Sequence, residues 1–399
     1  MSKYFEKQTC ISGIGQSEIY KRPTVYPFKL AMDACEAAIA DAGLKPSDID
    51  GACCWPAGIV GQSLAFGAAS ISDMAATLGL KLNWYSAGDM AAQLSPIMNA
   101  VAAIAAGYCD HVLCWRAMGE RWKPSYGSAA VEMMAERLKQ PAEGLMEFTA
   151  TAHAPSSAIW FACHATTHMA LYGTTREQMA WIPIVQRRHA GLNPKALHRE
   201  PLTMDDYMNG RMVTTPFTIY DCDVPCDGAT AVIVSRLEIA KDMKQKPAII
   251  EALGSGGYDR LDTWISRSDY PNMAMHDAGK MLWSRTDLKP KDIDTGHIYD
   301  GFTFLTMNWL EALNICGKGE SGPFIEGGER ISLDGELPLN SNGGQLSEGR
   351  MHGMSHLHEA VLQLRGQAGD RQVTRKAPKV AVVANGGGSL GGAALLRVD

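Results

Sequence analysis

The apolar positions at the start of the chain follow first a strand pattern and then a helix pattern. Residues 9–15 predict a buried strand. From Pro27 to Ala42 the apolar residues recur every three or four positions and share one face, which predicts an amphipathic helix. Gly43 follows at the position where a left-handed residue commonly ends a helix. A strand and a packed helix are therefore expected to open the chain.

A short stretch after this helix occurs again far along the chain. Residues 44–50 have the sequence LKPSDID and lead into a predicted strand at 51–55. Residues 288–294 have the sequence LKPKDID and lead into a predicted strand at 297–299, and a predicted helix at 274–285 precedes them. Two such similar stretches in the same register indicate an internal duplication.

A second pair of segments supports the duplication. A predicted helix at 90–106 is followed by a strand at 111–115, and a predicted helix at 353–364 is followed by a strand at 379–384. Each half then runs strand, helix, strand, helix, strand. This order predicts an α/β fold with mostly parallel sheets covered by helices.

The segment between the halves has a different character. Its first part is rich in methionine and aromatic residues, which suits a pocket or a partner contact, although core packing is the commoner use of such residues. Thr174 and Glu177 have the spacing of a capping box and predict a helix to about Ala190, and residues 227–234 predict a buried strand. We divide the chain accordingly: residues 1–115 and 217–252 form the N-terminal half, 116–216 the inserted loop and helical region, and 253–399 the C-terminal half.

Composition and charge exclude several classes of protein. The chain has 399 residues, 46% of them hydrophobic, and a formal net charge of -6, so neither disorder nor a basic nucleic-acid surface is expected. The N-terminus lacks an apolar signal core and no run is long enough to span a bilayer, so we expect a cytoplasmic protein without membrane contact. The ten cysteines are scattered within apolar patterns, as buried free thiols are, and Cys222 and Cys226 lack the second pair of a zinc site.

Residues 339–356 combine glycines, small polar side chains, charges and histidines at unusual density. Glycines allow close approach of the backbone to a ligand or a positive φ, and the helix expected from Gly353 can present amide groups at its start. We interpret the stretch as the floor of an active site; the alternative is a tight strand-to-helix turn. His352 and His356 lie four apart on the predicted helix, but they have no third ligand nearby, so we expect no metal site.

Several motifs together resemble one family. The duplicated halves and the Asn385-Gly386-Gly387-Gly388 sequence are similar to the thiolase superfamily. The 299–303 sequence YDGFT, the 340–353 loop, the 227–231 sequence DGATA and the His168 to Gly173 stretch resemble its sterol-carrier-protein thiolase branch and the lipid-transfer-protein-like relatives. The resemblance covers nearly the whole chain and implies a thiolase fold, with duplicated βαβαβ halves that form a layered αβαβα core around the inserted region.

The same resemblance shows that the residues of thiolytic chemistry are replaced. The family's acyl-accepting cysteine falls at Met90, its Gly-His-Pro histidine at Arg350, and its second cysteine near Ala384. A thioether cannot be acylated reversibly. Acyl transfer through cysteine is therefore not expected.

The Tyr299-Asp300 pair resembles the bacterial steroid side-chain aldolases, which cleave a β-hydroxyacyl-CoA by a retro-aldol reaction. This resemblance implies Tyr299, Asp300, Arg350 and His352 as catalytic residues. Tyr299 is the first candidate for the base or proton shuttle, with an orienting hydrogen bond as the alternative, and a base would need a depressed pKa, which Arg350 would supply. Arg350 stands where these aldolases commonly carry tyrosine. It either stabilises the enolate or holds a CoA phosphate, or it pairs with Glu348 or Asp300.

The substrate-binding residues implied by this reading are dispersed along the chain. They are Asp89, Met90, Tyr258, Glu348, Gly387 and Gly388. Asp89 also suits a helix N-cap, and Tyr258 also suits a surface turn. No cofactor is implied, because the substrate itself carries coenzyme A.

The expected activity is cleavage of a CoA thioester with a bulky, steroid-like acyl part into a short acyl-CoA, such as propionyl-CoA or acetyl-CoA, and a ketone or aldehyde. The resemblance also implies a homodimer and a separate small partner that combines an OB-fold with a zinc ribbon, often associated with a hydratase. The 122–148 stretch is the expected contact for that partner or for the steroid. The alternatives are a cysteine-independent acyltransferase or condensing enzyme of the same fold, and a non-catalytic carrier of acyl-CoA or lipid.

Overall fold

The computed structural model describes residues 4–22, 25–56, 69–88, 94–120, 147, 149, 151–154, 156–257 and 267–399. Nine strands form one sheet: β1 Thr9–Gln16, β2 Gly51–Cys54, β3 Trp84–Ala87, β4 His111–Gly119, β7 Asp227–Arg236, β8 Ala248–Ser255, β9 Thr295–Ile298, β10 Val380–Asn385 and β11 Gly392–Arg397. The larger helices are α1 Pro27–Ala42, α2 Ile71–Leu78, α3 Ser95–Ala105, α6 Ser157–Tyr172, α7 Arg176–Gly191, α10 Ala274–Ser284, α11 Thr303–Ala312 and α14 Met354–Arg365.

Short elements complete the fold. They are the helices α8 Met204–Met208, α9 Leu237–Ala240, α12 Ser321–Ile325 and α13 Gly344–Ser347, and the hairpin of β5 Met212–Thr214 and β6 Phe217–Thr218. Within the part of the chain that the structure describes, no helix has the length and apolar content needed to cross a membrane.

The sheet consists of two halves in the order β3-β2-β4-β7-β1 and β8-β11-β10-β9. The halves meet where β1 pairs with β8, and that pairing involves only Cys10 with Ile249 and Ile11 with Ala248. The expected boundary between residues 252 and 253 falls within β8, which pairs along most of its length with β11.

The expectation of mostly parallel strands is wrong. Among the described strands, β2 runs parallel to β3 and β4, and β9 runs parallel to β10, but the other neighbours in the sheet are antiparallel. The strand-helix-strand units account only for the parallel pairs. In each half, further strands return beside them: β10 and β11 are joined by six residues, too few for the crossover that a parallel pair needs.

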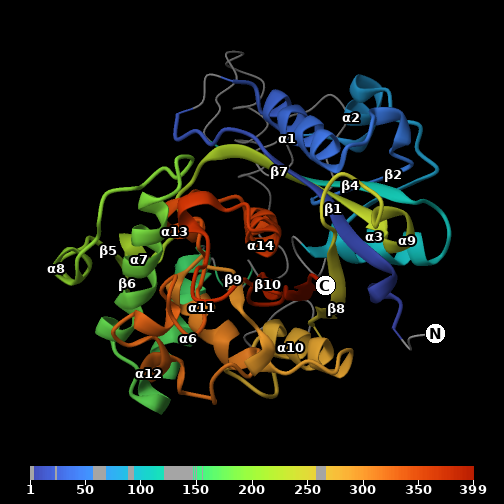
Figure 1. The fold of residues 1–399 in the computed structure, drawn as a ribbon. Coiled ribbons are helices and arrows are strands. Elements are labelled where there is room, and N and C mark those ends of the chain that lie inside the picture. The colour runs from blue at the N-terminus through green and yellow to red at the C-terminus, as the bar shows by residue number, and fades with distance from the viewer. Residues whose placement is uncertain are drawn as a thin grey trace.

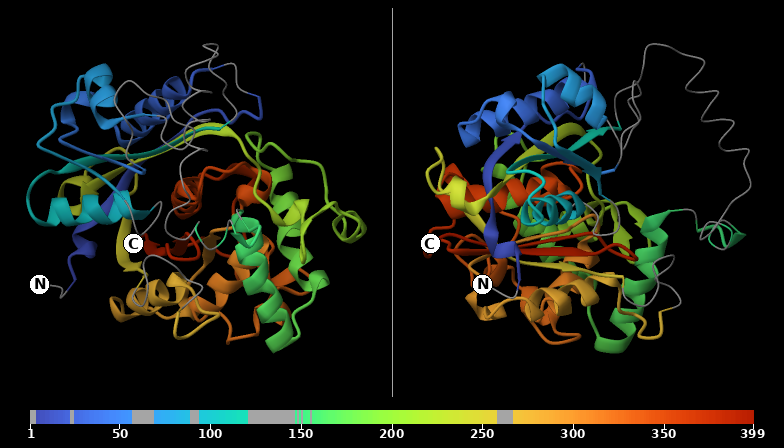
Figure 2. Two further views of the ribbon diagram at one scale, coloured as in Figure 1. Left: turned by 180° about the vertical axis from the view of Figure 1, so that it is seen from behind. Right: turned by 90° about the vertical axis from the view of Figure 1, so that its right-hand side faces the viewer.

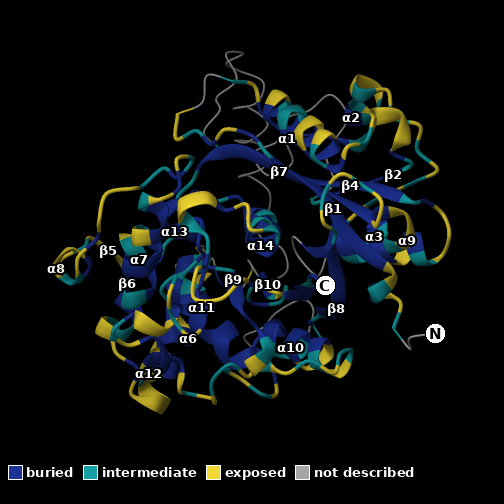
Figure 3. Cartoon of the chain, viewed as in Figure 1, coloured by how far each residue is buried: buried dark blue, intermediate teal, exposed yellow. Residues whose placement is uncertain are grey.

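Helices and sheet halves alternate in layers, as the thiolase fold requires. Figure 1 shows α1 and α2 above the first half of the sheet, α14 in the middle, and α10 and α11 below the second half, and Figure 2 shows the same stack from two further sides. The strands serve two cores because successive side chains point to opposite faces. On β7, Val232 and Val234 pack toward α3 and α14, whereas Ala231 and Ile233 pack toward α1. Helix α14 and the strands of the sheet other than the edge strand β3 are accordingly mostly buried (Figure 3).

The internal duplication is visible in the packing of strand on helix. The stretches 44–50 and 288–294 each contain a 3-10 turn, Pro46–Asp48 and Pro290–Asp292. Before them, β1 lies against α1 so closely that a Cβ on Gly15 would come within 2.2 Å of the Ala34 carbonyl oxygen. Correspondingly, a Cβ on Gly254 of β8 would lie 2.1 Å from the Ala278 carbonyl oxygen of α10. Both halves therefore use glycine to bring a strand against its helix.

Two helix starts differ from the expectation by small amounts. The capping box of α7 is formed by Thr175 and Gln178, one residue later than expected, because the Thr174 hydroxyl instead bonds the His168 ring. Helix α14 begins at Met354, so His352 precedes the helix and only His356 lies on it.

We predict that Gly15→Ala lowers the free energy of unfolding by about 1–3 kcal/mol, because the added methyl group forces α1 away from β1. Urea unfolding followed by fluorescence measures the change. Gly191→Ala is the matched control, because a Cβ there would meet its nearest neighbour at an ordinary 3.5 Å. Equal stability of the Gly15 and Gly191 variants would contradict the close packing.

Candidate active site

A cluster of polar side chains lies where β4 and β9 end. It is formed by Tyr299 after β9, Arg116 and Glu120 at the end of β4, Asp223 in the loop before β7, and Arg350 and His352 between α13 and α14. We call these six residues the polar cluster. The carboxyl ends of parallel strands are the usual place for a ligand in open α/β sheets.

Tyr299 is held by backbone contacts on both sides. Its amide donates to the Ala384 carbonyl at 2.8 Å, and its own carbonyl accepts from the Thr306 hydroxyl at 3.2 Å. The ring lies over Gly301, where a Cβ would come within 3.0 Å of the phenol oxygen. The phenol therefore has one firmly defined position.

The expected depression of the Tyr299 pKa is wrong. Burial raises the pKa of the phenol, and the nearby Asp223 carboxylate raises it further. Arg350 acts in the expected direction but is outweighed. Tyr299 is therefore a neutral hydroxyl at physiological pH, which can donate a proton and relay one.

Arg350 forms an ion pair with each of two carboxylates. Its Nη1 lies 3.0 Å from Asp223 Oδ1, and its Nη2 contacts Glu120 Oε2. Burial opposes its charge, but Asp223 and Glu120 keep the pKa of Arg350 above its usual value. The suggested pairing with Glu348 or Asp300 is wrong, because the backbone amide of Arg350 bonds the Val224 carbonyl at 2.7 Å and turns the side chain toward the loop before β7.

Asp223 was not identified from the sequence. Burial raises the pKa of its carboxyl to about 7, with Arg350 opposing and Asp300 and Glu120 adding to the rise. The side chain keeps 11% of its surface exposed, which leaves it within reach of a bound molecule. No local pattern indicates its role, because its partner Arg350 lies 127 residues away.

Arg116 and His352 form a second contact inside the polar cluster. Arg116 is fully buried, stacks over the Trp55 ring at 4.8 Å and donates from Nη2 to His352 Nδ1 at 2.9 Å. Burial and the two arginines lower the pKa of His352 well below its usual value. A neutral ring that accepts at Nδ1 carries its proton on Nε2. Burial also lowers the pKa of Arg116 to about 9, which leaves it charged at neutral pH.

Asp300 lies next to Tyr299 in the sequence and is engaged by the protein interior. It is completely buried and accepts hydrogen bonds from the Gln345 side chain at 3.4 Å and the Leu346 amide at 3.3 Å. His356 Nε2 lies 3.2 Å from Asp300 Oδ1, the oxygen that also accepts from Gln345. A Cβ on Gly344 would collide with this carboxylate, so the glycine allows α13 to pack on Asp300. A catalytic role for Asp300 stays a prediction, and these contacts support a positioning role.

The glycine-rich stretch is a rigid, buried scaffold. Gly343, Gly344, Gly349 and Gly353 all have positive φ, as expected. Glu348 is buried and accepts from Asn193 at 3.1 Å and from Asn342 at 2.6 Å, and burial raises its pKa to about 7. At the start of α14, the amides of Met354 and His356 already bond local carbonyls.

The Asn340 side chain completes the edge of the sheet next to Tyr299. Its Oδ1 accepts from the Ile298 amide at 2.7 Å, and its Nδ2 donates to the Ile298 carbonyl at 2.8 Å. The buried side-chain amide of Asn340 thus makes the two hydrogen bonds to Ile298, the last residue of β9, that a neighbouring strand would otherwise make. The position of Tyr299 depends on this pair of bonds.

The remaining predicted binding residues fall into two groups. Gly387 packs against the Leu305 side chain, and Gly388 accepts a hydrogen bond from the Ala274 amide at 3.0 Å. Their role in substrate binding, like that of Glu348, stays a prediction. Asp89, Met90 and Tyr258 lie outside the described residues, as does most of the 122–148 stretch.

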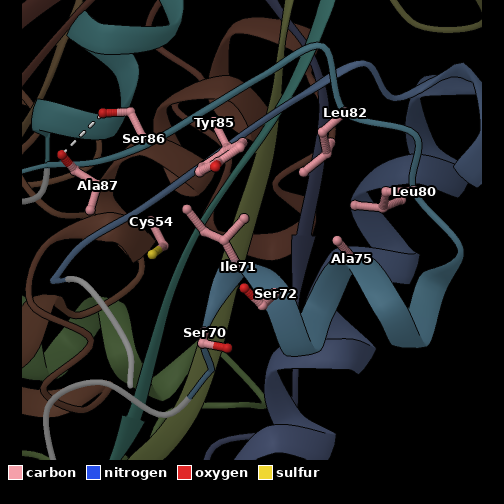
Figure 4. A pocket seen from close by; sticks show the side chains of 10 residues that line it. All are labelled: Cys54, Ser70, Ile71, Ser72, Ala75, Leu80, Leu82, Tyr85, Ser86 and Ala87. Carbon is pink, nitrogen blue, oxygen red and sulfur yellow. Dashed lines mark hydrogen bonds between the residues drawn. The ribbon is translucent and has the colours of Figure 1, made fainter. Parts of the chain in front are cut away.

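A pocket of about 550 Å³ is lined by ten residues around the end of β2 (Figure 4). Its walls come from the end of β2, the start of α2 and strand β3, and include Ile71, Ala75, Leu80 and Leu82. Cys54 lines it and interacts electrostatically with Arg116, which connects the pocket to the cluster.

The described residues contain neither a thiol with a lowered pKa nor a metal site that could form an alternative catalytic centre. All ten cysteines are free, and most are buried, as expected. Cys222, next to Asp223, has its pKa raised to about 12 by burial and by the flanking acids. Among the described residues, no group of three or more His, Cys, Asp or Glu side chains is arranged to hold a metal ion.

The chain is similar to several known proteins. A family model described as thiolase C-terminal domain-like matches residues 260–396. The chain is 33% identical over 365 residues to the 17-hydroxy-3-oxo-4-pregnene-20-carboxyl-CoA lyase of Mycobacterium tuberculosis, which covers 90% of this chain and 92% of the relative. It is 34% identical to the steroid side-chain-cleaving aldolase of Thermomonospora curvata, over 89% of this chain and 90% of the relative.

Solved structures extend the comparison to the fold. The Ltp2-ChsH2(DUF35) aldolase superposes with a TM-score of 0.85 at 30% identity and covers 99% of each chain. The acetyl-CoA acetyltransferase of Syntrophomonas wolfei superposes with a TM-score of 0.66 at 16% identity, over 98% of each chain, which shows the fold alone.

We predict that Asn340→Ala lowers the free energy of unfolding by about 1–3 kcal/mol, because both backbone groups of Ile298 lose their buried partner. Urea unfolding measures the change. Asn314→Ala is the matched control, since Asn314 also has a positive φ but is exposed. A loss no greater than that of the control would contradict the role of the Asn340 amide.

Proposed function

Because the chain belongs to the thiolase superfamily, in the branch of the steroid side-chain aldolases, we propose that it is a carbon–carbon lyase acting on a CoA thioester. The reaction is retro-aldol cleavage of a β-hydroxyacyl-CoA with a steroid acyl part. The products are a short acyl-CoA, propionyl-CoA or acetyl-CoA, and a ketone or aldehyde. No cofactor is required beyond the coenzyme A of the substrate.

One observation carries the proposal: a neutral phenol lies near a carboxylate and two arginines, in a chain that has Met90 at the position of the family's acyl-accepting cysteine. The neighbouring thiol, Cys222, has its pKa raised to about 12 by burial and is therefore a poor nucleophile. Retro-aldol cleavage needs no nucleophile on the enzyme. It needs a base for the β-hydroxyl proton and positive charge or donors for the enolate.

The polar cluster supplies both requirements. Tyr299 carries the proton between the substrate hydroxyl and a carboxylate, because its phenol is too weakly acidic to serve as a phenolate base. Arg116 and the neutral His352 supply positive charge and a ring N–H near the developing enolate oxygen. Arg350 is already committed to Asp223 and Glu120, so we assign it to fixing these acids rather than to a CoA phosphate.

The pocket beside the cluster suits a bulky acyl group. Its volume of about 550 Å³ and its partly aliphatic wall match the usual properties of a site for a large apolar ligand. We assign part of the steroid to this pocket, with the thioester directed toward Arg116.

Partner proteins are part of the proposal. The similar solved structure is named as an Ltp2-ChsH2(DUF35) aldolase, so its lyase chain occurs with a second component. We propose a homodimer of this chain together with a separate small protein that combines an OB-fold and a zinc ribbon, associated with a hydratase.

We predict that Tyr299→Phe lowers kcat for cleavage by about 10²–10⁴-fold with little change in KM, because the substrate binds but its proton has no relay. Mass spectrometry of the released acyl-CoA, with the partner protein present, measures the rate. Tyr108→Phe is the control, because Tyr108 is exposed after α3 and does not line the pocket. Full activity of Tyr299→Phe would favour a different proton carrier.

The same assay of the wild-type chain separates the alternative functions. Substrate binding without any cleavage would favour an acyl-CoA carrier, and formation of an acylated or condensed product would favour an acyltransferase.

We predict that Ala75→Trp raises KM for a steroid β-hydroxyacyl-CoA at least tenfold but leaves a short β-hydroxyacyl-CoA unaffected, because the indole fills the pocket. Steady-state kinetics with both substrates measure the difference. Ala76→Trp, the next residue on α2, is exposed and outside the pocket wall, and serves as the matched control. Equal loss with both substrates would place the steroid elsewhere.

A further inference from the structure

We propose that Asp223 is the general base of the cleavage reaction and receives the β-hydroxyl proton through the Tyr299 phenol. The inference rests on the proposed function and adds to it a residue on a loop that carries no recognisable catalytic motif. Its support comes from the position of the loop, the balance of charge and the protonation of the two groups.

The Asp223 loop is fixed against both other parts of the site. The Asp223 amide donates to the Gly301 carbonyl at 3.2 Å, directly after Tyr299 and Asp300. The next amide, that of Val224, donates to the Gln345 carbonyl of α13 at 3.0 Å. Together with the bond from the Arg350 amide to the Val224 carbonyl, these contacts tie the loop to both the Tyr299 turn and the glycine-rich stretch. The backbone of Asp223 is therefore fixed against the turn that carries Tyr299, and its carboxylate acts electrostatically on the phenol.

The charges around Asp223 are unequal. Glu120 and Asp300 face it from β4 and β9, and Arg350 faces it from the segment before α14. Three carboxyl groups, those of Asp223, Glu120 and Asp300, thus lie near one cation, Arg350. A second cation, Arg116, interacts electrostatically with Glu120. Because like charges disfavour full ionisation, one carboxyl group of such a set holds a proton readily.

Asp223 has the properties that the chemistry asks of a base. Burial, opposed by Arg350 and aided by Asp300 and Glu120, raises its pKa to about 7, the region in which a general base both accepts and releases protons efficiently. Tyr299, with its raised pKa, keeps its own proton until it can pass it on. Cys222, the adjacent residue, stays a neutral thiol because its pKa is raised to about 12.

The proton and electron movements balance without any further reactant. The substrate hydroxyl gives its proton to the Tyr299 oxygen as that oxygen gives its own to the Asp223 carboxylate. The electron pair of the broken O–H bond forms the C=O bond of the ketone or aldehyde. The electron pair of the broken Cα–Cβ bond is left on the acyl-CoA fragment, as an enolate delocalised over Cα and the thioester oxygen. The proton held by Asp223 then returns along the same path to Cα, which yields the short acyl-CoA and restores the enzyme.

Glu120 is the other carboxylate in reach of Arg350, but it suits a different role. It interacts with both Arg350 and Arg116, whereas the carboxylates that act on the Tyr299 phenol are Asp223 and Asp300. Asp300 in turn is engaged by α13 and His356. Glu120 is therefore a positioning residue that holds Arg350 in place and raises the pKa of Asp223.

The experiment follows kcat/KM against pH from about 5.5 to 9 for the wild-type chain and three variants, with the partner protein and a steroid β-hydroxyacyl-CoA. In the wild type, activity falls tenfold per pH unit below about pH 7, because protonated Asp223 cannot accept a proton. Asp223→Asn lowers kcat by about 10²–10⁴-fold and removes this acid limb. Glu120→Gln moves the limb to lower pH, since a negative neighbour that raises the pKa of Asp223 is lost. Asp223→Glu restores a limb at a reduced rate.

Glu251→Gln is the matched control. Glu251 is equally buried and ion-paired, with Lys7 and Arg397, but lies on β8 away from the polar cluster. This variant is expected to lose stability and to keep the wild-type pH profile. Wild-type activity with an unchanged acid limb in Asp223→Asn would overturn the assignment of the base while leaving the lyase function intact. A wild-type chain that binds the substrate and never cleaves it would instead refute the lyase function, and the inference with it.

Discussion

The site of this protein depends on one arginine that lies between two acids. Arg350 joins Asp223, from the loop before β7, to Glu120, from the end of β4. Removing one partner of such a buried arrangement leaves a charge without compensation, which costs several kcal/mol. The ion pairs therefore hold together three segments that are distant in sequence. They also decide which carboxyl group near Tyr299 carries a proton.

The buried scaffold makes this arrangement precise in position. The Asn340 amide satisfies both backbone groups of Ile298, and Asp300 accepts from the start of α13. Each of these polar groups is buried and paired, so moving any of them would break a hydrogen bond in a medium that offers no replacement. The glycines with positive φ make room for these contacts. A dense stretch of small and polar residues thus acts as structural support around a few reacting groups.

The protein environment also changes the expected protonation states of Tyr299 and its neighbouring carboxylate. An arginine near a tyrosine suggests a phenolate, because the positive charge favours the ionised form. Here burial raises the pKa of Tyr299, Asp223 adds to the rise, and together they outweigh Arg350. The same burial raises the pKa of Asp223 into the physiological range. The phenol is therefore suited to passing protons and the carboxylate to holding them.

The sequence by itself determined the layered α/β fold and the duplication, and it selected Tyr299 and Arg350 as candidate site residues, because helix periodicity, repeated turns and family motifs are local features of the chain. It failed on strand direction. Strand β7 returns beside β4 through pairing between distant segments, and β11 returns beside β10 after only six residues. It also missed Asp223, Glu120 and Arg116. Their roles arise only when segments separated by more than one hundred residues meet in a buried space, where charge pairing and loss of solvent set the protonation of each group.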